Sequence, residues 1–207
     1  MSIKIKHRYG HVIYECEAPS LREADLRHVD LCGADLRYAD LEGATLVGAI
    51  LTNADLSGAI LSSADLRQAN LTGAKLHDAV LSGAILTEAV LGGTILRGAD
   101  LEGADLEGAT LIGATLIGAK LYSTVLSRAD LRAANLSGAD LRAANLSGAD
   151  LWNAKLTSAN LTSADLTDAN LTDAKLTGAQ LTLAQLSVDD LSYAILRGAS
   201  ADQAVVL

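Results

Sequence analysis

Histidine and cysteine are the side chains of this sequence best suited to binding a metal ion or acting as nucleophiles, and they are few. A structural zinc site needs four such ligands, usually in closely spaced pairs. The spacings here are irregular, and two of the histidines flank an expected turn. We therefore expect exposed polar side chains, with no catalytic residue, no metal and no cofactor. The residues are His7, His11, His28, His77, Cys16 and Cys32.

Carboxylates are abundant, but their spacing argues against catalysis. Asp25, Asp30, Asp35 and Asp40 follow one another at intervals of five residues. A repeat that places an acid outside in every unit produces a solvated surface, whereas a catalytic pair needs a cleft. The same repeat generates five Asn-Leu-Ser/Thr triplets that match the glycosylation pattern without a secretory signal before them. We regard them as products of the repeat and do not expect them to carry glycans.

The dominant feature is leucine at every fifth position from Leu21 to Leu196, usually with alanine two residues earlier. Five residues advance about 140° around an α-helix, so the leucines would scatter around it. In a strand, where side chains alternate, successive leucines would fall on opposite faces. A coil that turns a corner in every unit keeps all of them inside. One representative column of this core is Leu26, Leu46, Leu66, Leu86, Leu106, Leu126, Leu146, Leu166 and Leu186.

Glycine supports a corner in each unit. Sixteen of the 18 glycines lie two residues after a leucine, from Gly33 to Gly198. Glycine adopts positive φ at little cost and therefore favours tight turns. Asn53 and Asp78 occupy the same phase in other units, and both residue types are common in turns.

These units resemble the pentapeptide-repeat family, as Ala34–Tyr38 (ADLRY) and Ala134–Gly138 (ANLSG) illustrate. The resemblance extends over residues 21–200. It implies an all-β solenoid, specifically a right-handed quadrilateral β-helix of about nine coils with Leu and Ala inside. At about 4.8 Å per coil the rod would be roughly 43 Å long. Because alanine and leucine fill the interior, we expect no ligand cavity within it.

The chain divides into three parts. Residues 1–20 are expected to form an N-terminal β-hairpin cap, with Ile3–Lys6 and Val12–Cys16 as its strands. Residues 21–200 form the pentapeptide-repeat β-helix, and residues 201–207 form a C-terminal tail or short cap. Ser200–Gln203 has capping-box spacing, so a one-turn helical lid is one alternative. The other is an apolar tail, Val205, Val206 and Leu207, that contacts a second molecule.

Charge and composition limit the partners. The formal net charge of −9 disfavours direct binding to nucleic acid or to anionic membranes, which attract basic surfaces. No secretory signal and no apolar run long enough to cross a membrane is visible, so we expect a cytoplasmic protein. Two cysteines are too few for a disulfide framework. Free thiols are expected, and a Cys16–Cys32 bridge remains an alternative.

Eight units carry an aliphatic residue directly before leucine. If this position faces outward, they form an apolar belt, either tolerated surface packing or a partner site. The residues are Ile50, Ile60, Val80, Ile85, Val90, Ile95, Val125 and Ile195.

Three functions are compatible with these features. The first is a non-enzymatic structural or protein-interaction scaffold with a rigid acidic surface and an unknown protein partner. The second, implied by the family resemblance, is a DNA-mimicking inhibitor or protector of a type II topoisomerase such as DNA gyrase. The third is an ice- or crystal-binding surface, suggested by the run of threonines from Thr157 to Thr182. The resemblance also implies a possible homodimer through the C-terminal end.

Overall fold

Each five-residue unit closes with a hydrogen-bonded turn. The amide of Ala24 donates to the carbonyl of Leu21 at 3.1 Å, and this bond recurs from unit to unit. The third residue of the turn has positive φ, as in a type II turn; for Glu23 the value is 57°. Glycine is favoured at these corners but not required, because eighteen other residues adopt φ between 52° and 59° there.

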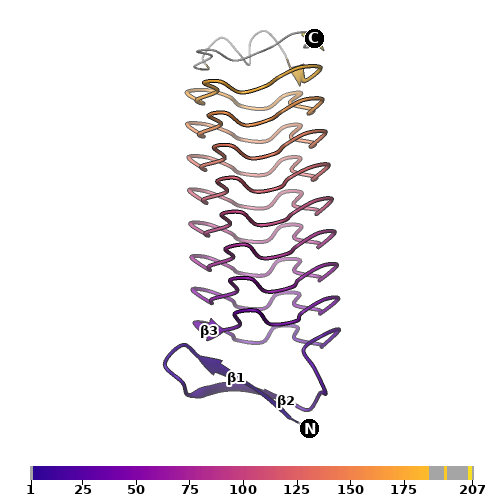
Figure 1. Cartoon of the computed structure of the whole chain (residues 1–207), viewed down its shortest axis with the longest axis vertical. Coiled ribbons are helices and arrows are strands. Elements are labelled where there is room, and N and C mark those ends of the chain that lie inside the picture. Colours follow the sequence, from indigo (N-terminus) through magenta and orange to yellow (C-terminus); the bar gives the residue numbers. More distant parts are fainter. Residues whose placement is uncertain (1, 187–193, 195–204, 207) are drawn as a thin grey trace.

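A computed structural model describes residues 2–186, 194 and 205–206 and shows stacked coils with a hairpin across one end (Figure 1). Parallel bridges join residues 20 apart, as in the series Asp25, Thr45 and Asp65. Four five-residue units therefore make one coil. The amide of Leu26 donates to the carbonyl of Thr45 at 2.8 Å, and the amide of Thr45 donates to Ala24 at 2.9 Å.

Most of these pairings are single bridges, so few residues form extended strands. The rod contributes β3 (Ala34–Asp35), β4 (Gln185–Leu186) and β5 (Val205–Val206). β4 and β5 pair in parallel, again across a 20-residue step. The described residues contain no helix, so the all-β fold class predicted from the sequence is confirmed. Within these residues nothing could serve as a membrane-spanning helix.

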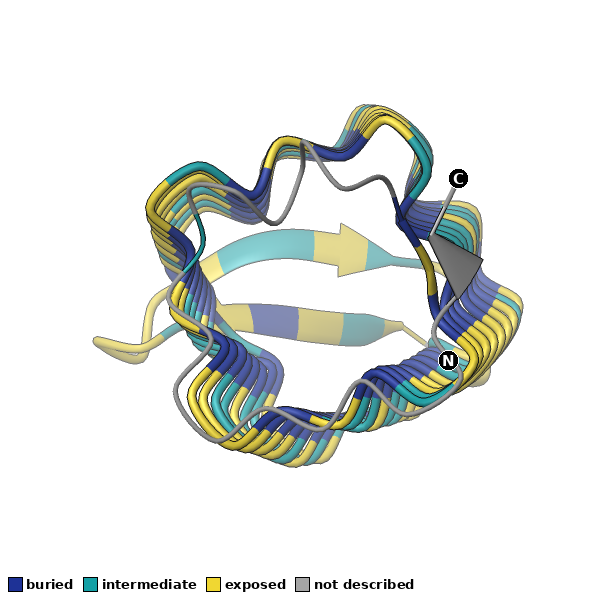
Figure 2. Cartoon of the chain, turned by 90° about the horizontal axis from the view of Figure 1, so that it is seen from above, coloured by how far each residue is buried: buried dark blue, intermediate teal, exposed yellow. Residues whose placement is uncertain are grey.

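Alanine and leucine fill the interior of the coils. Figure 2 shows the buried positions of successive coils stacked above one another. The leucines of the column from Leu26 to Leu186 have no exposed surface. Thr94 and Thr124 replace alanine and are equally buried. Their hydroxyls donate to the carbonyls of Leu91 and Leu101, at 2.8 and 3.0 Å. No buried side-chain polar atom of the described residues lacks a hydrogen-bond partner.

The N-terminal hairpin consists of β1 (Ile3–His7) and β2 (Val12–Cys16), which pair antiparallel. β2 has the bounds expected from the sequence, and β1 extends one residue beyond the expected Ile3–Lys6. β1 also pairs with β3, through Lys6 with Asp35 and His7 with Ala34. Ile5 is buried against the first coil. The hairpin thus covers the leucines at this end of the rod, which would otherwise face water.

One glycine allows the hairpin to approach the rod. At Gly33, which has φ of 64°, a Cβ atom would overlap the imidazole of His7. The amide of Arg8 donates to the carbonyl of Gly33 at 3.0 Å. Close packing against His7 therefore favours glycine at position 33 beyond the general preference for glycine at a corner of positive φ.

Corner side chains elsewhere lie over a glycine one coil further along. A Cβ at Gly48 would come within 2.5 Å of the His28 ring, and one at Gly58 within 2.6 Å of the Tyr38 ring. The aromatic corner residues His28 and Tyr38 are thus accommodated by glycines 20 residues later.

At the C-terminal end, the expected boundary at residue 201 and the Ser200–Gln203 capping box lie outside the described residues. The side chains of the predicted tail also lie outside the description, although the backbone of Val205–Val206 pairs with β4.

Replacing Gly33 tests how the hairpin is held. Gly33→Ala should release β1 and β2, because the new methyl group displaces His7. Gly103→Ala is the matched control, since Gly103 has the same φ of 64° but open space around its Cβ. In both variants the left-handed conformation of the new alanine destabilises the folded state by roughly 1–2 kcal/mol. Only Gly33→Ala should speed amide hydrogen exchange across residues 3–16, measured by mass spectrometry. Equal exchange in both variants would contradict this account.

Candidate interaction surfaces

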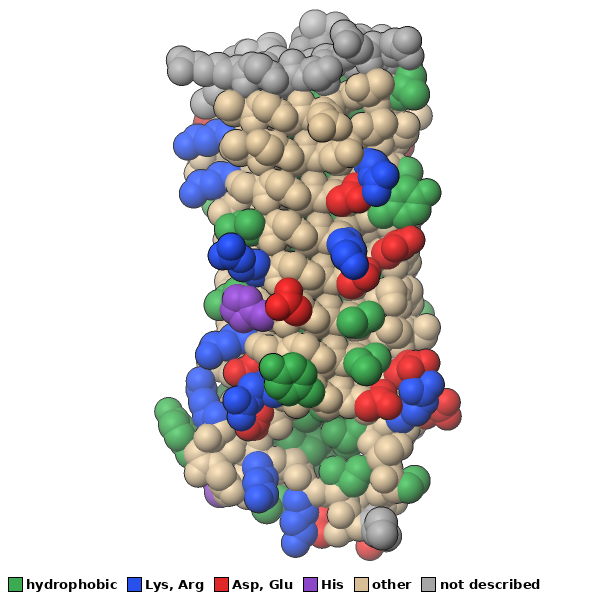
Figure 3. Space-filling view, viewed as in Figure 1, with side chains coloured by type: hydrophobic (Ala, Val, Ile, Leu, Met, Phe, Trp, Pro, Cys, Tyr) green, Lys and Arg blue, Asp and Glu red, His purple; other side chains and the backbone are tan. Residues whose placement is uncertain are grey.

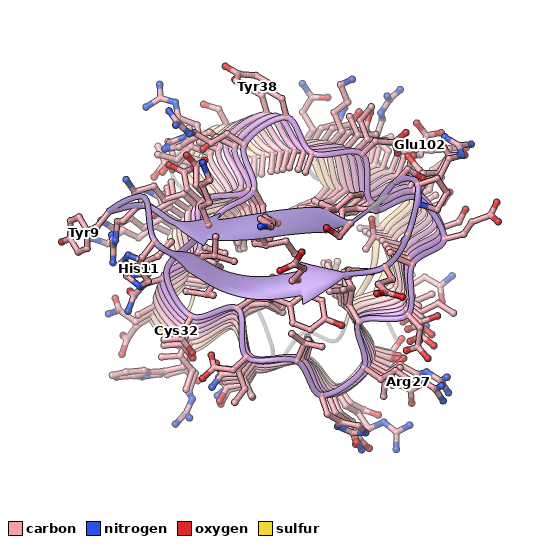
Figure 4. The ribbon with its side chains drawn as sticks, turned by 90° about the horizontal axis from the view of Figure 1, so that it is seen from below. Tyr9, His11, Arg27, Cys32, Tyr38 and Glu102 are labelled. Atoms are coloured by element: carbon pink, nitrogen blue, oxygen red, sulfur yellow. The ribbon has the colours of Figure 1, made fainter. Side chains whose placement is uncertain are left out.

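The 20-residue step sorts the outward side chains into four faces. We name each face by its first aspartate before leucine: the Asp25, Asp30, Asp35 and Asp40 faces. The Asp25 face, for example, comprises residues 25, 27 and 28 and their equivalents at 20-residue steps. Labelled side chains of the four faces point outward in different directions in Figure 4: Arg27, Cys32, Tyr38 and Glu102.

Aspartate before leucine is explained by a local ring of hydrogen bonds. The Oδ1 atom of Asp25 accepts from the backbone amide of Arg27 at 3.2 Å and from its Nε at 2.8 Å, while Arg27 Nη2 donates to Oδ2 at 2.5 Å. Every Asp-Leu-Arg sequence makes this two-pronged ion pair. The other pairs are Asp35–Arg37, Asp65–Arg67, Asp130–Arg132 and Asp140–Arg142. Much of the apparent acidity is therefore neutralised within the unit.

The ion pairs shift the titration of these carboxyl groups. Hydrogen bonds from the Arg27 side chain and backbone lower the pKa of Asp25 to about 2. The pKa values of the four equivalent aspartates are lowered in the same way, chiefly by their arginine side chains. All five acids therefore stay ionised at any physiological pH.

In the Asn-Leu-Ser/Thr triplets, asparagine accepts hydrogen bonds from the residue two positions later, as aspartate does in the Asp-Leu-Arg sequences. The hydroxyl of Ser137 donates to Asn135 Oδ1 at 2.7 Å, and the Ser137 amide donates to the same atom at 3.2 Å. Asn160 and Thr162 repeat this arrangement. The structure thus gives these triplets a reason to recur that does not involve sugar.

Further ion pairs join neighbouring coils. Arg22 binds Glu42 at 2.6 Å, and Lys120 binds Asp100 at 3.2 Å. Arg128 is also paired with Glu107. Exposed pairs of this kind contribute about 0–1 kcal/mol each, so they shape the surface charge more than they stabilise the rod.

The aliphatic residues before leucine face outward, but they do not gather into one patch. Ile50 and Val90 are about 40% exposed on the Asp30 face, while Ile60 and Ile85 lie on two other faces. Val80 stacks directly on Ile60. Ile195 lies outside the described residues. Spread around the rod in this way, these side chains do not form a single docking patch.

The hairpin end carries the histidines. His7 and His11 stack with ring centroids 4.8 Å apart, and Asp30 and Cys32 line the same shallow pocket of about 310 Å³. Desolvation, followed by the charges of His11 and Arg8, lowers the pKa of His7. Among the described residues, no three His, Cys, Asp or Glu side chains are grouped to hold a metal ion. Cys16 and Cys32 are free thiols.

A second cleft, of about 250 Å³, lies where the hairpin turn meets the first coils. Arg8, Arg37 and Lys75 line it together with Asp35 and Asp55. Asp35 is already bound by Arg37, and Asp55 accepts from Ser57. Both carboxylates are thus hydrogen-bonded within their own turns, and no serine, threonine, cysteine or histidine is among the residues that line the cleft.

Comparisons with known proteins agree with this architecture. The family model for pentapeptide repeats matches eight copies between residues 20 and 182. The crystal structure of HetL, a pentapeptide repeat protein involved in heterocyst differentiation regulation from the cyanobacterium Nostoc sp. strain PCC 7120, is 36% identical. It aligns over 88% of this chain and 82% of HetL, with a TM-score of 0.57.

Two further structures share shorter or looser similarity. Rfr23, a pentapeptide repeat protein from the cyanobacterium Cyanothece 51142, is 41% identical over 41% of this chain and 58% of its own, with a TM-score of 0.41. QnrB1, a plasmid-mediated fluoroquinolone resistance protein, is 26% identical over 76% of this chain and 79% of its own, with a TM-score of 0.48. A search of curated proteins found no match.

The Asp25–Arg27 pair makes a testable pH prediction. Because folding lowers the pKa of Asp25 to about 2, its stabilising contribution is complete above about pH 4 and is lost as the pH falls toward 2. Arg27→Gln should raise the pKa of Asp25 toward its usual range, as measured by ¹³C NMR of the carboxyl carbon. Arg97→Gln, which leaves this pair intact, is the control. An unchanged Asp25 titration in Arg27→Gln would disprove the assignment.

Proposed function

Because this chain belongs to the pentapeptide-repeat family, we propose that it is a non-enzymatic scaffold that binds protein partners along the sides of a rigid rod. For residues 21–200 we propose the family's right-handed quadrilateral β-helix of about nine coils. Residues 1–20 are its cap and residues 201–207 its tail. We place its action in the cytoplasm.

One observation carries this proposal. Within the described residues, the coils devote alanine and leucine to a filled interior and leave three outward positions per unit to vary. Asp35 and Asp55, the two carboxylates of the cleft beside the hairpin, are bound within their own turns. A surface with variable side chains on a rigid frame is suited to recognition and not to catalysis.

Affinity capture from the native host tests the scaffold function. The full-length chain is the bait, and HetL, a pentapeptide repeat protein that is 36% identical, is the control bait. We expect at least one protein captured by this chain alone that re-forms a complex of fixed stoichiometry from purified components, measured by light scattering. The absence of any such complex would overturn the proposal.

Mimicry of duplex DNA is the alternative, and the surface charge weakens it. Residues 21–200 carry 22 acidic and 13 basic residues, a net charge of −9. Duplex DNA of the same length, at one charge per roughly 1.7 Å, would carry about 25. Five of the aspartates are each bound to the arginine two residues later, so these carboxylates are not presented as isolated negative charges.

A supercoiling assay distinguishes the two functions. We expect micromolar protein to leave DNA gyrase activity and its inhibition by fluoroquinolones unchanged, because the paired carboxylates present a weaker field than phosphates do. QnrB1 serves as the comparison protein in the same assay. Inhibition or protection of gyrase by this chain at micromolar concentration would favour the alternative.

We also propose that two chains associate through their C-terminal ends, with Val205, Val206 and Leu207 in contact. The full-length chain should then elute as a dimer in chromatography with light scattering. Val205→Asp combined with Leu207→Asp should yield monomers, because the buried charges would lack partners. Val12→Asp, at the opposite end of the rod, is the control. A monomeric full-length chain would disprove the dimer.

A further inference from the structure

The Asp35 face carries several cations that form no ion pair with an acid of the described residues. Its outward ladder runs through Asp35, Asp55 and Lys75 and ends with Lys155 and Lys175. Arg97 lies on the same face. Among the described residues, Lys75, Arg97, Lys155 and Lys175 take part in no ion pair, and all four are exposed. Figure 3 shows Lys and Arg side chains following one another along one edge of the rod.

The other three faces contrast with this one, because each of their described cations is bound to an acid. These cations are Arg22, Arg27, Arg67, Lys120, Arg128, Arg132 and Arg142. The difference is also one of net charge. Over residues 21–186 the Asp35 face carries five basic and three acidic residues, a net charge of +2, whereas the Asp25, Asp30 and Asp40 faces carry −4, −3 and −3.

Lys155 and Lys175 are direct neighbours on adjacent coils. Like charges facing each other across a ladder are destabilising. On the Asp40 face the equivalent positions hold Asp100 and Lys120, which attract each other at 3.2 Å. The lysine pair therefore contributes nothing to the stability of the isolated rod, and an external anion would relieve its repulsion.

The surface between the cations is partly apolar. Ile95 and Ile117 lie half-buried between Lys75 and Lys155, and beyond Asp78 the described part of this face has no acid. The corner beside it carries Gly98, Gly118 and Gly138. No bulky corner side chain obstructs approach over these three coils.

We propose that the Asp35 face, from Lys75 to Lys175, binds an acidic segment of a partner protein. This proposal rests on the scaffold function proposed above and names the surface that performs it. The segment fits if it has apolar side chains over Ile95 and Ile117 and carboxylates toward both ends. At about 4.8 Å per coil, Arg97 and Lys155 lie roughly 14 Å apart, and Lys75 and Lys175 roughly 24 Å.

A polypeptide fits this surface better than a nucleic acid or a lipid bilayer does. The basic strip is one face wide, and both neighbouring faces carry a net charge of −3. A duplex or a membrane would extend over those acidic faces and be repelled. An α-helix about 10–12 Å across touches one face alone, and its apolar side chains can cover the two isoleucines.

Peptide selection tests the proposal. Full-length protein is used to select from a random library of 12-residue peptides displayed on phage, and the selected peptides are measured by fluorescence anisotropy. Lys155→Gln combined with Lys175→Gln removes two positive charges from the Asp35 face. The control, Gln180→Glu combined with Gln185→Glu, changes the net charge equally, at the same end of the rod, on the Asp40 and Asp25 faces.

We expect the selected peptides to be rich in Asp, Glu and apolar residues. They should bind the lysine double variant at least ten-fold more weakly than the unchanged chain and bind the control equally well. Affinity should also rise from 150 to 10 mM salt, because the screening length grows from about 8 to about 30 Å. The thermal midpoint of the lysine variant should be unchanged or higher, which separates lost binding from lost folding.

Other results overturn one or both proposals. Peptides that bind the lysine variant as tightly as the unchanged chain would disprove this surface and leave the scaffold function standing. Enrichment of no peptide over the starting library would count against both. Tighter lysine-dependent binding of a 20-base-pair DNA duplex, or of vesicles containing phosphatidylserine, would replace the protein partner with a different class of anion.

Discussion

The hydrogen bonds between successive coils govern the whole molecule. Leu26 donates to Thr45, Thr45 donates to Ala24, and the same pattern repeats through the described rod. Each bond joins residues about 20 apart, so four units must close one coil. Every property of the surface follows from this step, because it decides which residues stand above one another.

The interior depends on the same register. Each five-residue unit points one alanine and one leucine inward and three residues outward. The inward pairs of one coil stack on those of the coil below. Protein interiors are closely packed, so a side chain other than alanine at the inner position needs both room and a hydrogen-bond partner. Thr94 and Thr124 meet both requirements through the carbonyls of Leu91 and Leu101. The two threonines that replace alanine therefore satisfy the same packing requirement that alanine satisfies elsewhere.

Period-five leucine made the inward residues and the corners predictable, because neither a helix nor a strand can bring such leucines together. The hairpin was predictable from two short apolar segments around Tyr9-Gly10. The partial neutralisation of aspartate by arginine two residues later was also visible in the sequence, although its two-pronged geometry was not. Local spacing was sufficient in all three cases.

Interactions between coils were harder to predict. Sorting the sequence in 20-residue steps places Lys155 beside Lys175, but the unpaired state of these lysines depends on how far the neighbouring side chains reach. The close contact between the His7 ring and Gly33 could not be predicted from the sequence, because it joins a segment outside the repeat to one within it. The proposed association of the C-terminal tail with another molecule likewise depends on residues outside the repeat.

Contacts between corner side chains and the glycines one coil later all point the same way along the rod. His28 leans over Gly48 and Tyr38 over Gly58, always toward the C-terminal end. A large corner residue and the glycine beneath it fit each other. Replacing the glycine with a larger residue would crowd the corner side chain, and shortening the corner side chain would leave a gap over the glycine. Corner positions would therefore be expected to diverge in pairs 20 residues apart, and a graft that shifts coils by any other number would separate partners that fit only together.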